Sequence, residues 1–382
     1  MREDIRILHF TQSLPGGPAS YLEELARSQI TKYGEHNIRF LIPRHDRNHV
    51  PSIPDACLIG FEERERTAAA LSRLCKSALK EIRLFDPHIV HLHSSFAGAL
   101  VRGPFLFRRQ RPKVVYCAHG WAFSQEHSIF HKLIYAAAER LLMYATDVCI
   151  NISDNEARLA GRFRMPLGKC VTIENGISDA AAVSPITDMN FDKSKIHLLF
   201  VGRHDPQKGL DLLLKAMHSL SREDVHLHVL GAPVVSAGPS VQGSQDNVSF
   251  YGWVTRDQVS HFRAACDALV VPSRWEGFGL VVVEAMRMGR SAIVSNRGAL
   301  PGLVVDGQTG LVVDIQDESQ LSQALQSLDR EQMRSMGEQA RLRYLEYYTA
   351  DKMNARIEAI YAALTETRSP TSATAYLDAQ AN

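Results

Sequence analysis

Two glutamates eight residues apart, Glu276 and Glu284, flank a glycine-containing turn in the segment PSRWEGFGLVVVEAMRMG. The preceding run DALVV predicts a buried strand, and Leu280–Met288 predicts a helix. Gly277 and Gly279 then lie in the strand-to-helix loop, where the first amides of the helix have no partner inside the helix and point toward a bound anion. Carboxylates on either side of a diphosphate would accept hydrogen bonds from sugar hydroxyls, so the segment indicates a nucleotide sugar.

Two other interpretations of this segment compete with that one. Surface glutamates are mostly solvated, but a glycine loop, a helix start and neighbouring aromatic residues surround this pair. The segment also nearly matches the dinucleotide fingerprint G-x-G-x-x-G, except that Val282 stands where the last glycine would be. The missing glycine argues against a dehydrogenase.

A second segment, KIHLLFVGRHDPQKGLDLLLKAM, predicts a strand over Leu198–Gly202 and then an amphipathic helix. Arg203 and Lys208 lie between them, at the carboxyl end of the strand, which is where open parallel sheets bind ligands. Arg203 can bind two phosphate oxygens at once, and Lys208 acts as a point charge. Beside the Glu276 loop, these cations predict a diphosphate site; by themselves they would be ordinary solvated loop residues.

The set of motifs along the chain resembles the retaining glycosyltransferases of family 4, which have the GT-B fold, and in particular those of bacterial surface-polysaccharide assembly. The motifs occur in the family's order over the whole chain: Gly16-Gly17, His119-Gly120, Asn175-Gly176-Ile177, VGR with its KG pair, and E-x7-E with a GFG core. The resemblance implies an α/β protein of two Rossmann-like domains, whose parallel sheets face each other across a deep cleft.

The resemblance also implies roles for individual residues. His119 contacts the donor sugar, and Gly16 and Gly17 approach the phosphates, although Pro18 stiffens that loop and removes one amide. The expected catalytic residues are His119, Glu276, Arg203 and Lys208. The expected donor-binding residues are Gly16, Gly17, Gly202, Arg203, Lys208, Trp253, Val254, Glu276, Gly277, Phe278, Gly279, Leu280, Val281 and Glu284.

The predicted chemistry is transfer with retained configuration and without a metal or other cofactor. Breaking the anomeric bond places negative charge on the diphosphate, which Arg203, Lys208 and the helix amides would stabilise. No Asp-x-Asp motif occurs in the sequence, so a metal-held diphosphate is not expected. No carboxylate nucleophile stands out in the first half, which favours attack by the acceptor hydroxyl on the same face of the sugar. UDP is favoured over GDP as the nucleotide.

Alternating strand and helix patterns run through all 382 residues and predict parallel sheets with helices on both faces. This length suits two domains. The expected organisation is an acceptor-binding domain over 1–180, a linker over 181–194, a nucleotide-sugar domain over 195–349, a helix over 350–364 that crosses back to the first domain, and a disordered tail over 365–382. The predicted strands are 5–10, 38–42, 88–93, 114–118, 148–152, 171–174, 197–201, 226–230, 248–251, 268–271, 292–295 and 311–313.

Composition limits the class of partner. Hydrophobic residues make up 45% of the chain, charged residues 22%, and the formal net charge is +1, so nothing indicates nucleic acid. The six cysteines show no C-x2-C spacing, which suggests free thiols in a reducing compartment. With no signal peptide and no apolar run long enough to span a bilayer, we expect a cytoplasmic protein or one at the inner face of the plasma membrane.

The acceptor is expected to bind the first half of the chain, where the segment ALVRGPFLFRRQR combines basic and aromatic residues. This cluster suits a peripheral membrane contact, although a core-facing helix end with solvated arginines explains it equally well. A membrane contact would favour a polyprenyl-diphosphate-linked saccharide as acceptor. An epimerase of the same architecture and a non-catalytic nucleotide-sugar-binding subunit are the alternatives. The cluster residues are Arg102, Phe105, Phe107, Arg108, Arg109 and Arg111.

His91 and His93 alternate onto one face of a predicted strand and raise the question of a metal site. No carboxylate or cysteine lies at ligand spacing, so a core or acceptor-side role is expected.

Overall fold

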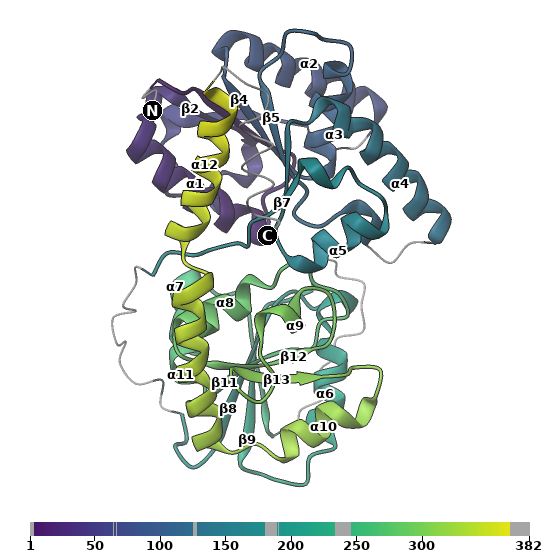
Figure 1. Ribbon diagram of the computed structural model, residues 1–382. Helices are drawn as coiled ribbons and strands as arrows, with labels where there is room; N and C mark the ends of the chain where they lie inside the picture. Colours follow the sequence, from purple (N-terminus) through teal and green to yellow (C-terminus); the bar gives the residue numbers. More distant parts are fainter. Residues whose placement is uncertain are drawn as a thin grey trace. The chain divides into compact units, whose positions relative to one another are not determined.

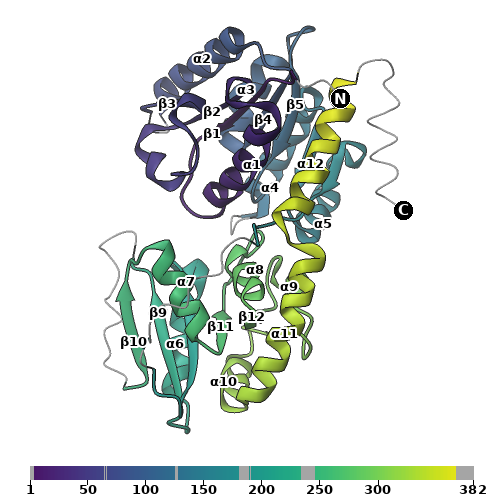
Figure 2. The ribbon, with the colours of Figure 1, turned by 90° about the vertical axis from the view of Figure 1, so that its left-hand side faces the viewer.

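The computed structural model describes residues 4–366 apart from 64, 66, 125–127, 180–188, 190 and 234–245 (Figures 1 and 2). The chain forms two compact units. The first contains the residues up to Ile177 together with those from Ala350 onward, and the second runs from Ser178 to Thr349. Most of the expected linker, 181–194, and the expected tail from 367 onward lie outside the described residues.

The first unit is built on a seven-stranded sheet in the order β3-β2-β1-β4-β5-β6-β7, in which all pairings are parallel. Its central strands are buried, as expected for a parallel sheet with helices on both faces. The strands are β1 (Ile7–Thr11), β2 (Ile38–Pro43), β3 (Leu58–Phe61), β4 (Ile89–His93), β5 (Lys113–Cys117), β6 (Val148–Asn151) and β7 (Cys170–Thr172).

Side-chain caps begin several helices of this unit. Thr67, Ser94 and Ser153 each accept a hydrogen bond from an amide of the first helical turn. The helices are α1 (Gly17–Tyr33), α2 (Ala68–Phe85), α3 (Ser95–Phe105), α4 (Ile129–Leu142), α5 (Asp154–Arg162) and α12 (Ala350–Thr365), with short 3₁₀ turns η1 (Glu35–Asn37), η2 (Arg44–His49), η3 (Asp55–Cys57), η4 (Ala122–Ser124), η5 (Met143–Ala145) and η6 (Leu167–Lys169).

Helix α12 packs along α1, although the second unit separates them in the sequence (Figure 2). Ser28 donates a hydrogen bond to Glu358 at 3.1 Å, and Asn354 donates one to the carbonyl of Glu24 at 3.3 Å. Ile357, Ile360 and Tyr361 on the inner side of α12 are buried. The helix is therefore part of the first unit.

The second unit contains a six-stranded sheet in the order β10-β9-β8-β11-β12-β13, also with parallel pairings. The strands are β8 (Ile196–Val201), β9 (Val225–Leu230), β10 (Val248–Gly252), β11 (Ala268–Val271), β12 (Ser291–Ser295) and β13 (Gly310–Val313). The helices are η7 (Pro206–Lys208), α6 (Leu210–His218), α7 (Arg256–Ala265), α8 (Leu280–Arg287), α9 (Leu300–Leu303), α10 (Glu318–Gln326) and α11 (Arg330–Tyr347).

The predicted pair of parallel α/β domains is confirmed by these two sheets. The capping box at Thr255 and Gln258 begins α7. One detail differs from the prediction, because strand β3 was not expected. Helix α1 begins at Gly17, since Pro18 fits the first turn of a helix, where its missing amide costs no hydrogen bond. Among the described residues, no helix combines the length and apolarity that spanning a bilayer requires.

Candidate active site

The Glu276 loop and the Lys208 loop meet at the carboxyl ends of the neighbouring strands β8 and β11. Lys208 Nζ lies 2.7 Å from Glu276 Oε2, and both side chains are mostly buried. The Ser273 hydroxyl lies 3.4 Å from the same carboxylate oxygen. Two residues that the sequence placed in one site are therefore in direct contact, as an ion pair at the sheet edge where α/β proteins bind ligands.

Backbone hydrogen bonds hold the two loops together. The Arg274 amide donates to the Gln207 carbonyl at 2.8 Å, and the Gln207 side chain donates to the Trp275 carbonyl at 3.2 Å. On the other side, the Ala299 amide donates to the Glu276 carbonyl at 3.0 Å. A Cβ added at Gly298 would lie 2.2 Å from this carbonyl oxygen, and its φ is +59°, so only glycine fits there.

Helix α8 begins at this site without a side-chain cap. Its N-cap is Gly279, with φ +104°, and no side chain accepts a hydrogen bond from the first turn. Phe278 is buried beneath the loop, and a Cβ at Gly279 would lie 2.9 Å from Leu300. Leu280 and Val281 begin the first turn, so the predicted phosphate-facing amides, those of residues 279–281, lie three to five residues beyond Glu276. Uncapped amides at a helix start attract anions.

Glu284 has a partner that the sequence did not reveal. Arg263, on α7, donates a hydrogen bond to Glu284 Oε2 at 2.5 Å. Arg263 is buried, and burial lowers the pKa of its guanidinium, while the Glu284 carboxylate raises it in part. The two residues lie on different helices, so no local spacing indicates the pair. One oxygen of Glu284 is thus engaged in this ion pair, and a quarter of its side chain is exposed.

The other predicted donor residues of this unit lie nearby or further along the sheet. Arg203, just after Gly202 at the end of β8, is half-exposed and contacts Asp205 and Gln207, each at 3.1 Å. Trp253 and Val254 follow β10, which is separated from β8 by β9. The Trp253 ring is mostly exposed. Arg203 is therefore bound to Gln207, the residue before Lys208, whereas Trp253 follows a strand two places away in the sheet.

In the first unit, His119 follows β5 in a strained turn. Its φ is +51°, and Gly120 follows with φ +114°. Its Nε2 lies 3.1 Å from His93 Nδ1, and the Tyr21 ring stands edge-on to it at 4.6 Å. A non-glycine residue in the left-handed region costs free energy and occurs often at functional sites. Gly16 (φ +91°) ends the loop after β1 as the N-cap of α1, and Gly17 is the first residue of that helix, at the same edge of the sheet.

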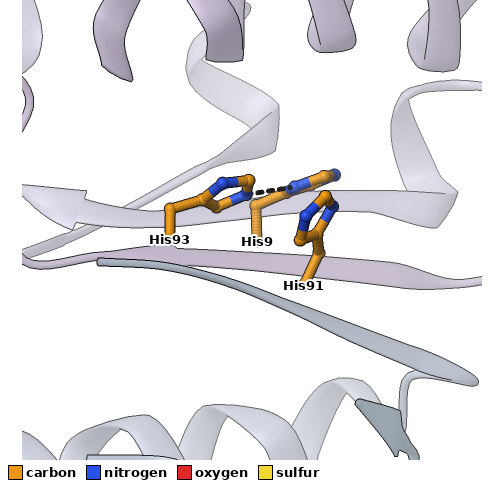
Figure 3. Close-up of side chains that lie close together, drawn as sticks. All are labelled: His9, His91 and His93. Atoms are coloured by element: carbon orange, nitrogen blue, oxygen red, sulfur yellow. Dashed lines mark hydrogen bonds between the residues drawn. The ribbon is translucent and has the colours of Figure 1, made fainter. Parts of the chain in front are cut away.

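His119, itself half-buried, contacts a series of buried imidazoles. His93 Nε2 lies 3.0 Å from His9 Nδ1, and His9 Nε2 lies 2.7 Å from Oε1 of Gln29 on α1. His91, opposite His9 on the neighbouring strand, pairs through Nδ1 with the Tyr361 hydroxyl at 2.6 Å. Figure 3 shows the rings of His9, His91 and His93 gathered on one side of the sheet.

These histidines are neutral at pH 7, because burial lowers the pKa of His9 and of His119 to about 4 and lowers the pKa of His91 and His93 well below the usual value. The sequence did not indicate a third imidazole beside His91 and His93. His9 comes from β1, and one nitrogen of each ring lies within 4.8 Å of the others. No carboxylate or thiolate belongs to this group to balance the charge of a buried dication.

The residues of the predicted membrane cluster do not share one surface. Arg102 is fully buried, donates to Glu139 Oε2 at 2.8 Å and stacks 3.6 Å from the centre of the Tyr116 ring. Phe105 is also buried, and Arg111 is paired with Asp147 at 2.5 Å. Arg102 and Phe105 lie on α3 with their side chains buried, so the prediction of a membrane-facing surface is wrong for these two residues. Phe107, Arg108 and Arg109 are exposed.

Comparisons with known protein families match both halves of the chain. The family described as Glycosyltransferase Family 4 matches residues 15–181, and the family described as Glycosyl transferases group 1 matches residues 187–343. An uncharacterized 41.2 kDa protein in the cps region of Klebsiella pneumoniae is 28% identical over 85% of this chain and 90% of its own length. An uncharacterized glycosyltransferase of Methanocaldococcus jannaschii is 26% identical over 69% of this chain and 65% of its own length.

Solved structures share the fold. Sucrose-phosphate synthase from Thermosynechococcus elongatus superposes with a TM-score of 0.79 at 20% identity, covering 94% of this chain and 99% of that one. Anabaena HepE, solved in complex with UDP and glucose, gives a TM-score of 0.76 at 17% identity, with the same coverage.

Proposed function

This chain belongs to the family 4, group 1 glycosyltransferases with the GT-B fold, and from that premise we propose that it moves a hexose-type sugar from a nucleotide-diphosphate donor to a saccharide acceptor, with retained anomeric configuration and without a metal ion. The proposal assigns the leaving diphosphate to the loops around Lys208 and Glu276.

The observation that carries the proposal is the contact between Lys208 and Glu276 beside the uncapped start of α8. A lysine, an arginine and a helix start in one place form a site that attracts negative charge. That charge grows on the diphosphate as the anomeric bond breaks, so the same groups would bind the transition state more tightly than the donor. Glu276 holds the ammonium group in place and is available to the sugar hydroxyls; it is a positioning group.

Retention in this proposal comes from attack on the same face of the sugar. A double displacement needs a carboxylate nucleophile beside the sugar, and Glu276 is engaged by Lys208. The acceptor hydroxyl would instead approach from the side of the leaving phosphate, which takes its proton. His119, neutral and held by His93, would contact the donor sugar.

The proposed donor and acceptor follow from what two similar proteins bind or where their genes lie. The HepE complex with UDP and glucose favours a UDP-hexose, with GDP-sugars second. The relative in a cps region favours polysaccharide biosynthesis, and a polyprenyl-diphosphate-linked saccharide at the inner face of the plasma membrane is the proposed acceptor.

A panel of UDP, GDP and their common sugars tests the donor by thermal shift, because a ligand at a hundred times its dissociation constant stabilises the native state by about 2.7 kcal/mol. We expect stabilisation by UDP-sugars in the native chain and its loss in Lys208→Ala. Arg334→Ala, which removes an exposed cation of α11, is the matched control and should behave like the native chain. A donor that is isomerised without an acceptor would instead identify an epimerase, and binding without any turnover a non-catalytic subunit.

A further inference from the structure

Helix α4 carries its apolar side chains on the outside of the first unit. Two stripes at spacing i, i+4 run along its solvent-facing side. Their large members are between 48% and 67% exposed, and Tyr144, just beyond the helix, is 78% exposed. Figure 1 shows α4 beside α3 at the edge of the unit. The exposed large residues of the helix are Ile129, Phe130, Leu133, Ile134, Tyr135 and Leu141.

The inner side of α4 is the polar one. Glu139, the only acidic residue of the helix, is buried; its Oε2 accepts from Arg102 and its Oε1 accepts from the Tyr116 hydroxyl at 3.0 Å. Ala136 is the other buried residue of the helix. The helix is thus inverted relative to an ordinary surface helix, with an ion pair against the core and a continuous apolar face toward water. Such a face on a monomer marks a contact surface.

We propose that this face of α4 docks the first unit onto an anionic lipid bilayer, as a helix lying in the interface between headgroups and acyl chains. The charges favour this occupant: the remaining charged side chains of α4 are Lys132 and Arg140, so its surface is apolar with cations only. Tyr135 and Tyr144 suit the headgroup level. The inference rests on the proposed function in one respect, since a lipid-linked acceptor gives the enzyme a reason to bind a membrane.

A second copy of the chain fits this face less well. A twofold interface places a surface against itself, and cations on both copies would then meet with no carboxylate between them. The anionic leaflet supplies the opposite charge.

Flotation of the full chain with vesicles of phosphatidylcholine and phosphatidylglycerol tests the proposal, with no donor or acceptor present. We expect binding that weakens with salt and falls at least about tenfold in a Phe130→Ser/Ile134→Ser double variant, because two large apolar side chains no longer enter the interface. Leu84→Ser/Leu342→Ser is the matched control, since these leucines are equally exposed on α2 and α11; it should bind like the native chain.

Several outcomes would overturn the docking surface. The native chain staying unbound at low salt is one, and an equal loss in the control is another. A dimer in light scattering that the double variant dissociates would assign the face to a second copy. Because the vesicles contain no substrate, failure of the proposed transferase activity would leave this result unchanged.

A separate inference follows from the histidine series. A neutral imidazole has one ring N–H that donates and one ring nitrogen whose lone pair accepts. Three hydrogen bonds in this series share such rings: Gln29–His9, His9–His93 and His93–His119. The donor in one of these hydrogen bonds therefore fixes the donor in the next. With Gln29 Oε1 as acceptor, His9 donates from Nε2 and accepts at Nδ1. His93 then donates from Nε2 and accepts at Nδ1 from His119 Nε2.

We infer that Gln29, His9 and His93 are positioning residues that hold His119 with its proton on Nε2 and its lone pair on Nδ1. Nδ1 of His119, for which the described residues supply no hydrogen-bond partner, would then accept a hydrogen bond from a sugar hydroxyl. This inference rests on the proposed contact between His119 and the donor sugar. The buried imidazoles then have a role. Through them, the side-chain amide of Gln29 on α1 determines which nitrogen of His119, after β5, carries the proton.

Nitrogen-15 NMR of histidine-labelled protein tests the tautomer directly, because protonated and lone-pair ring nitrogens resonate far apart. We expect the Nε2–H form of His119 in the native chain, identified by its absence in His119→Asn, and a mixture of tautomers in Gln29→Leu. Transfer in Gln29→Leu should fall by on the order of fivefold, the effect of one hydrogen bond. Tyr21→Phe is the control, since the Tyr21 hydroxyl is buried without a partner in the described part of the chain.

The Nδ1–H form in the native chain, or one tautomer in both proteins, would overturn the inference. So would one equivalent of zinc that is lost in His9→Phe, because a metal among these rings needs lone pairs on both His9 Nδ1 and His93 Nε2. The NMR result does not depend on turnover, so it remains decisive even if the proposed function fails.

Discussion

Because of Glu156, the free energy of unfolding of the first unit should depend on pH near neutrality. This α5 residue is buried; its Oε2 accepts a hydrogen bond from the Ile152 amide at 2.9 Å, and its Oε1 has no partner within the described residues. Burial raises the pKa of the Glu156 carboxyl from 4.5 to about 7, against the opposing effect of the Ile152 and Gly120 amides. We expect Glu156→Gln to stabilise the protein at pH 8 but hardly at pH 5.

The sign follows from linkage. The folded pKa lies above the unfolded one, so the folded state binds the proton more tightly, and this stability is present below pH 4.5 and lost as the pH rises through 7. The shift of roughly 2.5 pKa units corresponds to about 3 kcal/mol. Between pH 5 and pH 8 the free energy of unfolding of Glu156→Gln should therefore rise by about 2.5 kcal/mol relative to the native chain.

Urea unfolding measures this difference in a background with Trp253→Phe and Trp275→Phe, where fluorescence comes from Trp121. Trp121 is buried in the first unit and donates to Asn151 at 3.1 Å, so it reports on the unit that contains Glu156. Glu331→Gln, an exposed change on α11, should show no such pH dependence. An advantage for Glu156→Gln that is the same at pH 5 and pH 8 would refute the reasoning.

Four further predictions concern the candidate active site. Lys208→Ala should reduce turnover by on the order of a hundredfold or more with the thermal unfolding midpoint unchanged, since the lost charge acts on the departing diphosphate; native turnover in this variant would remove Lys208 from the site. EDTA should leave the initial rate intact, and a rate that only manganese or magnesium restores would contradict the proposed metal independence. NMR of the product from a UDP-α-sugar should show an α linkage, whereas a β linkage would exclude retention. Gly298→Ala should abolish the UDP-induced thermal shift, because its Cβ would displace the Glu276 carbonyl, while Gly302→Ala, which meets no atom within 4 Å, should keep it.

The sequence predicts the fold because parallel strands are continuous apolar runs that glycine and proline punctuate. Strand β3 escapes this rule because LIGF is short and contains a glycine. The donor-side residues of the second unit are predictable for another reason: the motifs around Lys208 and Glu276 each combine a strand end, glycines and a helix start within a few residues. The sequences of these two loops are therefore enough to predict the site.

Contacts between distant segments are not predictable in this way. Arg263 pairs with Glu284 across two helices, and His9 joins His93 from a strand 84 residues earlier. Arg102 was assigned to a membrane contact because basic and aromatic residues are combined in its segment, and nothing near it in the sequence shows that Glu139 would neutralise it inside the unit. Which side of α4 meets the core depends on that same ion pair.

The place of α12 in the fold has a consequence for how the chain is made. Because α12 completes the first unit but follows the second in the sequence, the first unit cannot close its core while only its own early residues have left the ribosome. The Tyr361 hydroxyl that pairs with Nδ1 of His91 is synthesised 270 residues after His91. The second unit, continuous in sequence, is under no such constraint. During synthesis we therefore expect the middle of the chain to reach its native state before the beginning does, with α1 open to chaperones until α12 arrives.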